Sequence, residues 1–251
     1  MKVLNVCGVK DSGKTTTIEH IIRELSARGY KVGSIKEIHF EQFAIDPDPQ
    51  SNTNRHKAAG AGLVCARGLH ETDILFPRQL SMAQILRFYN TDFDWVVVEG
   101  GSDLIAPLII TAHGEEDLLQ KWGEQNGMVF CVSGRISAQI GEYRGVPVID
   151  AVSRTEEFVN FIERRVYDSL PDFPPECCSA CGMTCSELGG AILKGLKSRS
   201  DCVADKGAEL TVGGRRINMV PFVQRILKNA VLGVVSELDG YEAGCDIEVR
   251  F

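Results

Sequence analysis

The sequence predicts an α/β fold in which a mostly parallel sheet carries helices on both faces. Over residues 1–165, short apolar runs that are typical of buried strands alternate with segments whose apolar residues recur at helical spacing. The first apolar run is followed directly by a glycine-rich loop and an amphipathic segment, an order that is common in parallel sheets. A chain of 251 residues of which 44% are hydrophobic can bury the core that this fold requires.

The glycine-rich loop reads G-V-K-D-S-G-K-T over residues 8–15 and matches the pattern G-x-x-x-x-G-K-[ST] in full. Because a strand is expected before it (2–7) and a helix after it (16–28), the pattern predicts the phosphate-binding loop of a P-loop NTPase. We expect Lys14 to reach the β- and γ-phosphates and the Thr15 hydroxyl to bind Mg²⁺. The expected nucleotide-binding residues are Gly8, Lys10, Asp11, Ser12, Gly13, Lys14, Thr15 and Thr16.

Further elements follow in the same alternating order. Ser153 and Glu156 have the spacing of a capping box, which predicts that a helix begins there and runs to about residue 166. The polar segment 37–52 contains two prolines and predicts a long loop. The remaining strands are expected over 31–36, 62–66, 94–99, 108–111, 128–133 and 146–149, and the remaining helices over 53–59 and 80–89.

Prolines 171, 174 and 175 predict a domain boundary. We therefore expect a P-loop nucleotide-binding domain over residues 1–170 and a small α+β cysteine-rich module over 171–251. Within the module the sequence predicts a helix that begins at Cys185 and a hairpin over 209–219 that turns at residues 213–214. A second helix is expected over 223–232, and an edge strand over 246–251.

The overall charge and hydropathy narrow the classes of partner. A net charge of −7 and a pI near 5.3 argue against nucleic acid as the main partner. No apolar run is long enough to span a bilayer, and the first segment lacks the order of a signal peptide. We therefore expect a cytoplasmic protein without a membrane partner.

Two carboxylates are candidates for work on the γ-phosphate. Glu99 ends the apolar run 94–99, where it can hold Mg²⁺ through water or orient a nucleophile. Asp46 and His39 lie in the long loop and can fold over the phosphates, so Glu99 and Asp46 are the expected catalytic residues. Because the chain has no N-K-x-D segment, the guanine-reading element of many GTPases, the choice between GTP and ATP stays open.

Residues 1–165 resemble the MobB family of P-loop proteins from molybdopterin-guanine dinucleotide synthesis. The resemblance is carried by the loop 8–16, Lys36, His39, Asp46, the segment 53–61 and the strand end at Glu99. It implies a GTP-binding accessory protein that hydrolyses nucleotide slowly, and therefore a weak GTPase. It also implies a homodimer that assists a molybdopterin nucleotidyltransferase or a molybdenum- or tungsten-dependent enzyme.

Four of the nine cysteines have a spacing that suits metal binding: Cys178, Cys181, Cys185 and Cys202. Four thiolates can hold either Zn²⁺ or an iron–sulfur cluster. The local sequence resembles the small four-cysteine [4Fe–4S] domain of some electron-transfer and corrinoid-linked subunits, although that domain usually has one more residue between its second and third cysteines. The resemblance implies a [4Fe–4S] cluster, while the chemistry of four thiolates leaves Zn²⁺, or no metal, as the alternatives. Cys177 is a neighbour of the set and is expected to be dispensable.

Two other functions are compatible with the same residues. One is a nucleotide-gated metallochaperone or electron-transfer switch, in which the cysteines are the working end. The other is a P-loop kinase of a small molecule, although the sequence shows no obvious acceptor pocket. Metal content together with single-turnover hydrolysis separates the metallochaperone or electron-transfer switch from the accessory protein. Phosphate transfer to a small molecule would reveal the kinase.

Overall fold

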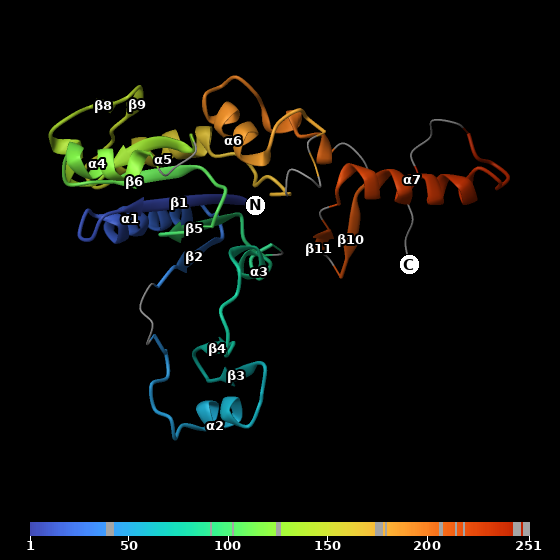
Figure 1. Ribbon diagram of the computed structural model, residues 1–251, viewed down its shortest axis with the longest axis horizontal. Coiled ribbons are helices and arrows are strands. Elements are labelled where there is room, and N and C mark those ends of the chain that lie inside the picture. Colours follow the sequence, from blue (N-terminus) through green and yellow to red (C-terminus); the bar gives the residue numbers. More distant parts are fainter. Residues whose placement is uncertain are drawn as a thin grey trace.

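The computed structural model describes residues 1–251 except 39–42, 91, 102, 124–126, 174–177, 179, 206–207, 214, 218, 243–246 and 248–251. Its centre is a five-stranded, all-parallel sheet in the order β2-β5-β1-β6-β7 (Figure 1). The strands are β1 (Lys2–Gly8), β2 (Val32–Lys36), β5 (Trp95–Glu99), β6 (Leu108–Thr111) and β7 (Val129–Ser133). Since the strands are parallel, their carboxyl ends meet at one edge of the sheet, and the predicted α/β class is confirmed.

Both faces of the sheet are covered by helices. On one face, α1 (Lys14–Ala27) and α5 (Thr155–Arg165) bury Leu4, Val6 and Val97 against side chains such as Ile21 and Phe158. On the other face, the short helix α3 (Met82–Leu86) covers Val3, Val96 and Val98. Burying each of these aliphatic side chains contributes about 1.5–3 kcal/mol to the free energy of folding. This packing also fixes the sheet edge from which the P-loop extends.

Most expected elements of residues 1–165 occur within two or three residues of their predicted bounds. The sequence did not predict α4 (Glu115–Trp122), whose Leu118 enters the core, nor the two-residue strand β8 (Glu142–Tyr143). The strand expected over 146–149 is present as the two-residue β9 (Val146–Pro147), which pairs with β8. A 3₁₀ turn, η1 (Arg135–Ala138), follows β7.

The predicted capping box at the start of α5 is wrong. The helix begins after Arg154 without a side-chain cap. The Ser153 hydroxyl instead donates to Asp150 Oδ2 at 2.6 Å, and Asp150 Oδ1 accepts from the backbone N–H of Val152 at 2.8 Å. The serine is therefore held by the turn that precedes the helix and does not reach the helix N–H groups.

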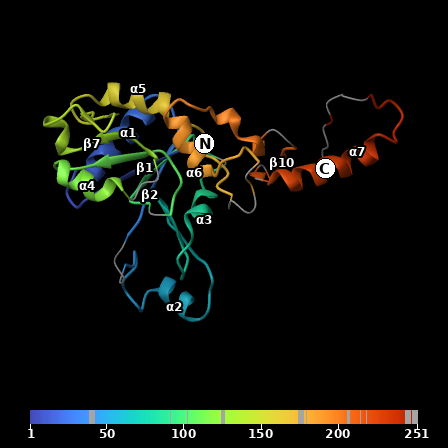
Figure 2. The ribbon, with the colours of Figure 1, turned by 45° about the horizontal axis from the view of Figure 1, so that its top comes forward.

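Residues 43–80 leave the sheet and form an arm, which hangs from the sheet edge in two views (Figures 1 and 2). It contains α2 (Asn52–Ala58) and an antiparallel hairpin of β3 (Val64–Arg67) and β4 (Thr72–Leu75), of which β4 was not predicted. The arm exposes the large apolar side chains Phe43, Ile45, Leu63, Leu69 and Ile74, and Leu69 is 98% exposed. An exposed apolar surface of this kind is typical of a protein–protein contact.

The C-terminal part begins on the main core and then leaves it. Helix α6 (Cys185–Leu193) starts with a capping box between Thr184 and Glu187, and its Leu188 and Leu193 pack into the same core as α1 and α5. The 3₁₀ turns η2 (Arg199–Asp201) and η3 (Val203–Asp205) lead to the expected hairpin, β10 (Leu210–Val212) and β11 (Arg215–Ile217). Helix α7 (Pro221–Val235) then runs outward (Figure 1). The expected strand over 246–251 falls on positions outside the described residues, apart from Ile247, which has no regular secondary structure.

In the part of the chain that the structure describes, no helix is both long and apolar enough to cross a lipid bilayer.

Candidate nucleotide site

The loop between β1 and α1 is shaped by two glycines with positive φ. Gly8 has φ +153°, and a Cβ there would lie 2.2 Å from the Thr111 carbonyl oxygen. Gly13 has φ +100° and is the N-cap of α1. At Gly8 both the positive φ and the close approach to β6 require glycine, and at Gly13 the positive φ favours it. The two glycines let the loop curl in front of the first turn of α1, which carries no acidic side chain.

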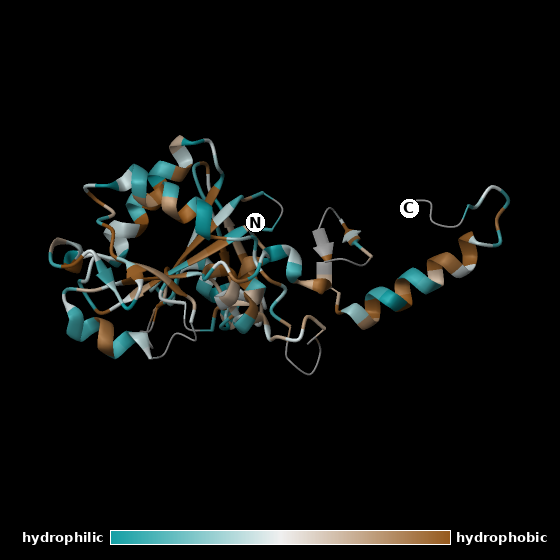
Figure 3. Ribbon diagram, turned by 90° about the horizontal axis from the view of Figure 1, so that it is seen from above, coloured by the Kyte–Doolittle hydropathy of each residue, from teal (hydrophilic) through white to brown (hydrophobic). Residues whose placement is uncertain are grey.

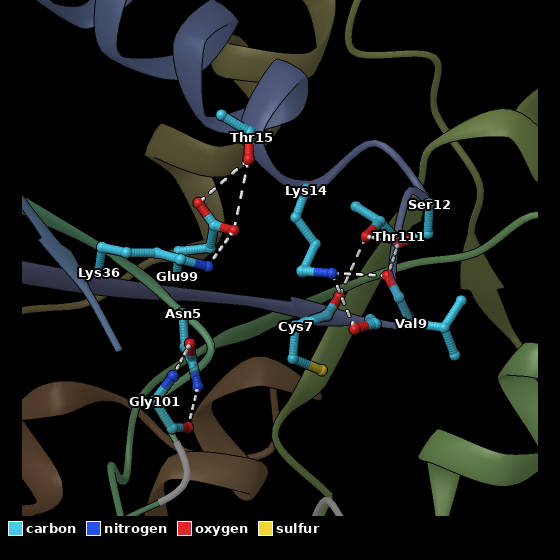
Figure 4. A network of polar contacts seen from close by, with 11 residues as sticks. Asn5, Cys7, Val9, Ser12, Lys14, Thr15, Lys36, Glu99, Gly101 and Thr111 are labelled. Carbon is cyan, nitrogen blue, oxygen red and sulfur yellow. Dashed lines mark hydrogen bonds and ion pairs between the residues drawn. The ribbon is translucent and has the colours of Figure 1, made fainter. Parts of the chain in front are cut away.

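The Lys14 side chain lies across this loop (Figure 4). Its Nζ donates to the carbonyl oxygens of Gly8 at 3.1 Å and Val9 at 2.5 Å. Burial lowers the pKa of Lys14, and the negative charge of Glu99 opposes that shift. The ammonium group therefore lies inside the concavity where P-loop lysines meet the β- and γ-phosphates.

Glu99 is held beside the expected Mg²⁺ ligand. It ends β5, is only 8% exposed, and accepts hydrogen bonds from Thr15 Oγ1 at 3.3 and 3.4 Å. Lys36, its register partner on β2, donates to Glu99 Oε1 at 2.5 Å. The buried Asn5 amide fixes the loop after Glu99 through two bonds to the Gly101 backbone, at 2.7 and 3.2 Å (Figure 4). The structure thus brings Thr15 and Glu99 together.

Substituting Glu99→Gln removes a negative charge next to Thr15 and keeps the size of the side chain. We expect Mg²⁺-dependent nucleotide hydrolysis to slow by at least about tenfold, since the amide is a weaker partner for Mg²⁺ or its water. Nucleotide affinity without Mg²⁺ should change by no more than a few-fold, because the loop and Lys14 remain. Single-turnover hydrolysis and calorimetry measure both, and an unchanged hydrolysis rate would return Glu99 to a purely structural role.

The loops after β6 and β7 hold the P-loop from the other side. Ser12 Oγ and Thr111 Oγ1 are 2.8 Å apart. The His113 ring bridges Asp117 Oδ2, 3.0 Å from Nδ1, and the Asp11 carbonyl oxygen, 3.0 Å from Nε2. Both partners carry acceptor oxygens, so the ring links the start of α4 to the P-loop. Asp11 itself has φ +58°, a strained value for a residue with a Cβ, and His113 stabilises that conformation.

A cavity of ≈ 960 Å³ opens over the P-loop. On one side it is lined by the P-loop, the start of α1, Lys36 and Glu99, and on the other by the turns after β7 and β9. Pockets that bind small molecules and cofactors generally have about this volume. The expected residues on its wall are Lys10, Asp11, Gly13, Lys14, Thr15 and Thr16; the additional ones are Thr17, Ser133, Gly134, Arg135, Ser137, Ala138, Asp150, Ala151 and Val152.

One general feature of the sequence pointed to the region of the residues that were not predicted. Asn5, Thr111, Ser133 and Asp150 all lie in or just after strands that share one sheet edge. The rule that ligands bind beyond the carboxyl ends of parallel strands points to that edge. It does not say which side chains face the cavity, because that depends on loop conformation.

The structure does not bring Asp46 to the cavity. The Asp46 carboxylate accepts from the hydroxyls of Ser51, at 2.5 Å, and Thr53, and those bonds lower its pKa. It thereby fixes the entry into α2 on the arm and is not among the cavity residues. His39 lies outside the described residues.

The four cysteines that were expected to hold a metal lie in one region but do not form a site. Cys178, Cys181 and Cys185 are half-buried and Cys202 is buried, and all four belong to or pack against the main core. Burial raises the pKa of the Cys185 thiol, and the nearby Cys202 adds to that shift. Among the residues that the structure describes, no three His, Cys, Asp or Glu side chains come together as a metal ion requires. The placed thiols therefore do not support the [4Fe–4S] expectation, and Cys177 lies outside the described residues.

Comparisons with known proteins fit the geometry of the nucleotide site. Residues 3–122 match the model of the family described as molybdopterin guanine dinucleotide synthesis protein B, MobB. A putative molybdopterin-guanine dinucleotide biosynthesis adapter protein of Methanocaldococcus jannaschii is 25% identical over 100% of this chain and 97% of its own length. A probable adapter protein of the same pathway from Bacillus subtilis is 26% identical over 59% of this chain and 85% of its own length.

The fold is also that of a solved structure. The crystal structure of Bacillus subtilis MobB covers 67% of this chain and 100% of that chain, with a TM-score of 0.51 and 20% identity. The matched segment 3–122 contains the P-loop, Lys36 and Glu99, which line the phosphate end of the cavity, and Thr111, which contacts Ser12 of the P-loop. Over residues 3–122, which include the P-loop, this chain is therefore similar to the MobB family.

Proposed function

We propose that this chain binds GTP with Mg²⁺ at the P-loop and acts as an adapter in the synthesis of molybdopterin guanine dinucleotide. The observation that carries the proposal is that Lys14, Thr15 and Glu99 line one cavity. All three residues belong to the segment that matches MobB. Lys14, which contacts the Gly8 and Val9 carbonyls, would hold the β- and γ-phosphates, and Thr15 together with Glu99 would hold Mg²⁺, which neutralises phosphate charge.

Hydrolysis is expected to be slow. Glu99 is engaged by both Lys36 and Thr15, so it is better placed to hold Mg²⁺ through water than to activate a nucleophile. Asp46, the other carboxylate expected to be catalytic, is bound to Ser51 and Thr53 on the arm. Among the described residues, neither of the two expected carboxylates is free to position the attacking water, and a weak GTPase is the consequence.

Asp150 favours guanine over adenine as the base. It lines the cavity on the side opposite the P-loop, and its hydrogen bond from Ser153 lowers its pKa, which keeps the carboxylate ionised. Guanine carries N–H donors at N1 and N2, whereas adenine has an acceptor and a C–H in those places. Because a carboxylate accepts more than the two hydrogen bonds it already has, Asp150 can bind the guanine edge.

Calorimetric titration of the full chain tests nucleotide choice directly. We expect one Mg·GTP per chain, bound at least about tenfold more tightly than Mg·ATP, since one charge-assisted hydrogen bond contributes roughly 1.5–3 kcal/mol. Asp150→Asn should remove most of the preference and leave ATP affinity unchanged within about twofold. Equal affinities for the two nucleotides in the wild type would contradict the guanine assignment.

An adapter protein also needs a surface that contacts a partner enzyme, and the arm offers one. The exposed apolar side chains of the arm, among them Leu69 and Ile74, offer a surface for a nucleotidyltransferase or a molybdenum- or tungsten-dependent enzyme. In a reaction reconstituted from molybdopterin, Mg·GTP and a molybdopterin nucleotidyltransferase, adding this chain should raise the yield of dinucleotide. Leu69→Asp should lose that gain while keeping nucleotide affinity. If the wild type gives no gain but still binds GTP, the adapter role fails and nucleotide binding stands.

A [4Fe–4S] cluster on Cys178, Cys181, Cys185 and Cys202 is a second proposal, independent of the nucleotide site. The spacing of these cysteines along the sequence supports it. It requires the thiols to close together from their described positions. We expect about four irons and four sulfides per chain after anaerobic purification. One zinc per chain, or no metal, would overturn the cluster.

A further inference from the structure

Four cationic side chains line the cavity over the P-loop: Lys10, Lys14, Lys36 and Arg135. Lys14 donates to backbone carbonyls of the P-loop, and Lys36 donates to Glu99. Lys10 and Arg135 make no hydrogen bond or ion pair with any residue that the structure describes. Of these two unpaired cations, Arg135 alone comes from outside the P-loop, so the cavity holds a second, separate source of positive charge.

The turn that carries Arg135 is fixed against the P-loop. It follows β7, one of the buried strands that form the hydrophobic centre of the molecule (Figure 3). At Gly134 a Cβ would lie 2.3 Å from the Ser12 carbonyl oxygen, so the backbone before Arg135 packs closely on the P-loop. Ile136 is fully buried, and its N–H donates to the Ala112 carbonyl oxygen at 3.0 Å. Both neighbours of Arg135 are therefore held in place, while its own side chain is exposed at the cavity wall.

The turns after β7 and β9 form one wall of the cavity. Ser133, the last residue of β7, joins them, because its Oγ donates to the Ile149 carbonyl oxygen at 2.7 Å and accepts from the Ala151 N–H at 3.3 Å. Arg135 and Asp150 thus belong to the same wall, and Arg135 is on the turn that contacts the P-loop. A nucleotide that extends from the P-loop to Asp150 passes Arg135.

The order of these groups along the cavity indicates which phosphate Arg135 meets. Lys14 lies in the concavity that is expected to hold the β- and γ-phosphates. Thr15 and Glu99, the expected Mg²⁺ side, lie toward β5, and β5 and β7 are on opposite sides of β1 in the sheet. Asp150 is the proposed contact of the base. Since the α-phosphate links the β-phosphate to the nucleoside, it is the phosphate that lies nearest to Arg135.

We propose that the Arg135 guanidinium binds the α-phosphate of the nucleotide. The inference rests on the proposed nucleotide site and adds to it a contact from outside the MobB-matching segment 3–122. A planar guanidinium can donate two parallel hydrogen bonds to two oxygens of one phosphate. Because GTP and GDP both carry an α-phosphate, the contact forms with either nucleotide.

Calorimetric titration of the full chain with Mg·GTP and Mg·GDP tests the contact. We expect Arg135→Gln to weaken the binding of both nucleotides by similar factors of about 10 to 100, the effect of losing charge-assisted hydrogen bonds. Arg135→Lys, which keeps the charge, should bind both more tightly than Arg135→Phe, which keeps only a flat side chain. The matched control is Arg164→Gln, in the last turn of α5 and away from the cavity wall, which should leave both affinities within about twofold because salt screens a distant exposed charge.

Thermal unfolding without nucleotide should be the same for Arg135→Gln and the wild type, since the side chain is exposed. Unchanged affinities in Arg135→Gln would overturn the contact. A loss with GTP alone would move Arg135 to the γ-phosphate, and a Phe variant that binds better than the Lys variant would move it to the base; either result overturns the α-phosphate assignment. A wild type that binds neither nucleotide would overturn the nucleotide site itself, and this contact with it.

Discussion

Replacing Lys14 with Ala is expected to weaken GTP binding by at least about 100-fold. The substitution removes the ammonium group that lies in the P-loop concavity, 3.1 Å from the Gly8 carbonyl oxygen, and with it two or more charge-assisted hydrogen bonds to phosphate. Each such bond contributes roughly 1.5–3 kcal/mol, and about 1.4 kcal/mol corresponds to a tenfold change in affinity. Calorimetric titration measures the loss.

The control for Lys14→Ala is Lys197→Ala, which removes an exposed lysine of the C-terminal part and should leave GTP affinity unchanged. The free energy of unfolding of the Lys14 variant should stay close to that of the wild type, since Lys14 makes only loop contacts. A Lys14 variant that binds GTP as well as the wild type does would contradict the P-loop assignment.

Gly134→Ala has the second-largest expected effect. Gly134 has φ +87°, and a Cβ there would lie 2.3 Å from the Ser12 carbonyl oxygen. The unfavourable φ and the steric overlap with Ser12 would both distort the loop after β7, which packs against the P-loop. We expect the free energy of unfolding to fall by about 2–4 kcal/mol and GTP affinity to fall with it.

Chemical denaturation and titration of the same preparations test this prediction. Gly141→Ala is the matched control, because nothing lies within 4 Å of a Cβ at Gly141 and its φ is not positive. It should leave stability within about 0.5 kcal/mol of the wild type. If the two alanine variants behave alike, the close contact between the β7 loop and the P-loop has no energetic importance.

The local pattern of the sequence was enough to predict the sheet and the phosphate end of the site. Gly8, Gly13, Lys14 and Thr15 could be assigned because strand, glycine loop and helix follow one another without a break. The strand that ends at Glu99 could be assigned from the apolar run that precedes the carboxylate, since a strand that is buried throughout needs no alternation of polar and apolar residues.

The rest of the site depends on contacts between distant residues. His113 reaches the Asp11 carbonyl across 102 positions, and Asp150 enters the cavity only because β9 follows the edge of β7. Asp46 was expected at the phosphates, yet local hydroxyls at Ser51 and Thr53 bind its carboxylate first. A spacing pattern does not predict which partner each side chain binds, because competing hydrogen bonds in the folded chain decide it.

The cysteine module shows the same limit. The spacing of Cys178, Cys181, Cys185 and Cys202 indicates a four-thiolate site, whereas the described chain packs those thiols against an apolar core. A sequence pattern gives the donors and their order, but the distances between them come from how α6 and η2 pack.

A crystal structure of the full chain with Mg²⁺ and a non-hydrolysable GTP analogue tests the central claim most directly. We expect Lys14 Nζ to contact the β- and γ-phosphates in place of the Gly8 and Val9 carbonyls. We also expect Mg²⁺ at Thr15 Oγ1, near Glu99, and the base against Asp150. A nucleotide bound elsewhere, with Lys14 still on the two carbonyls, would contradict it.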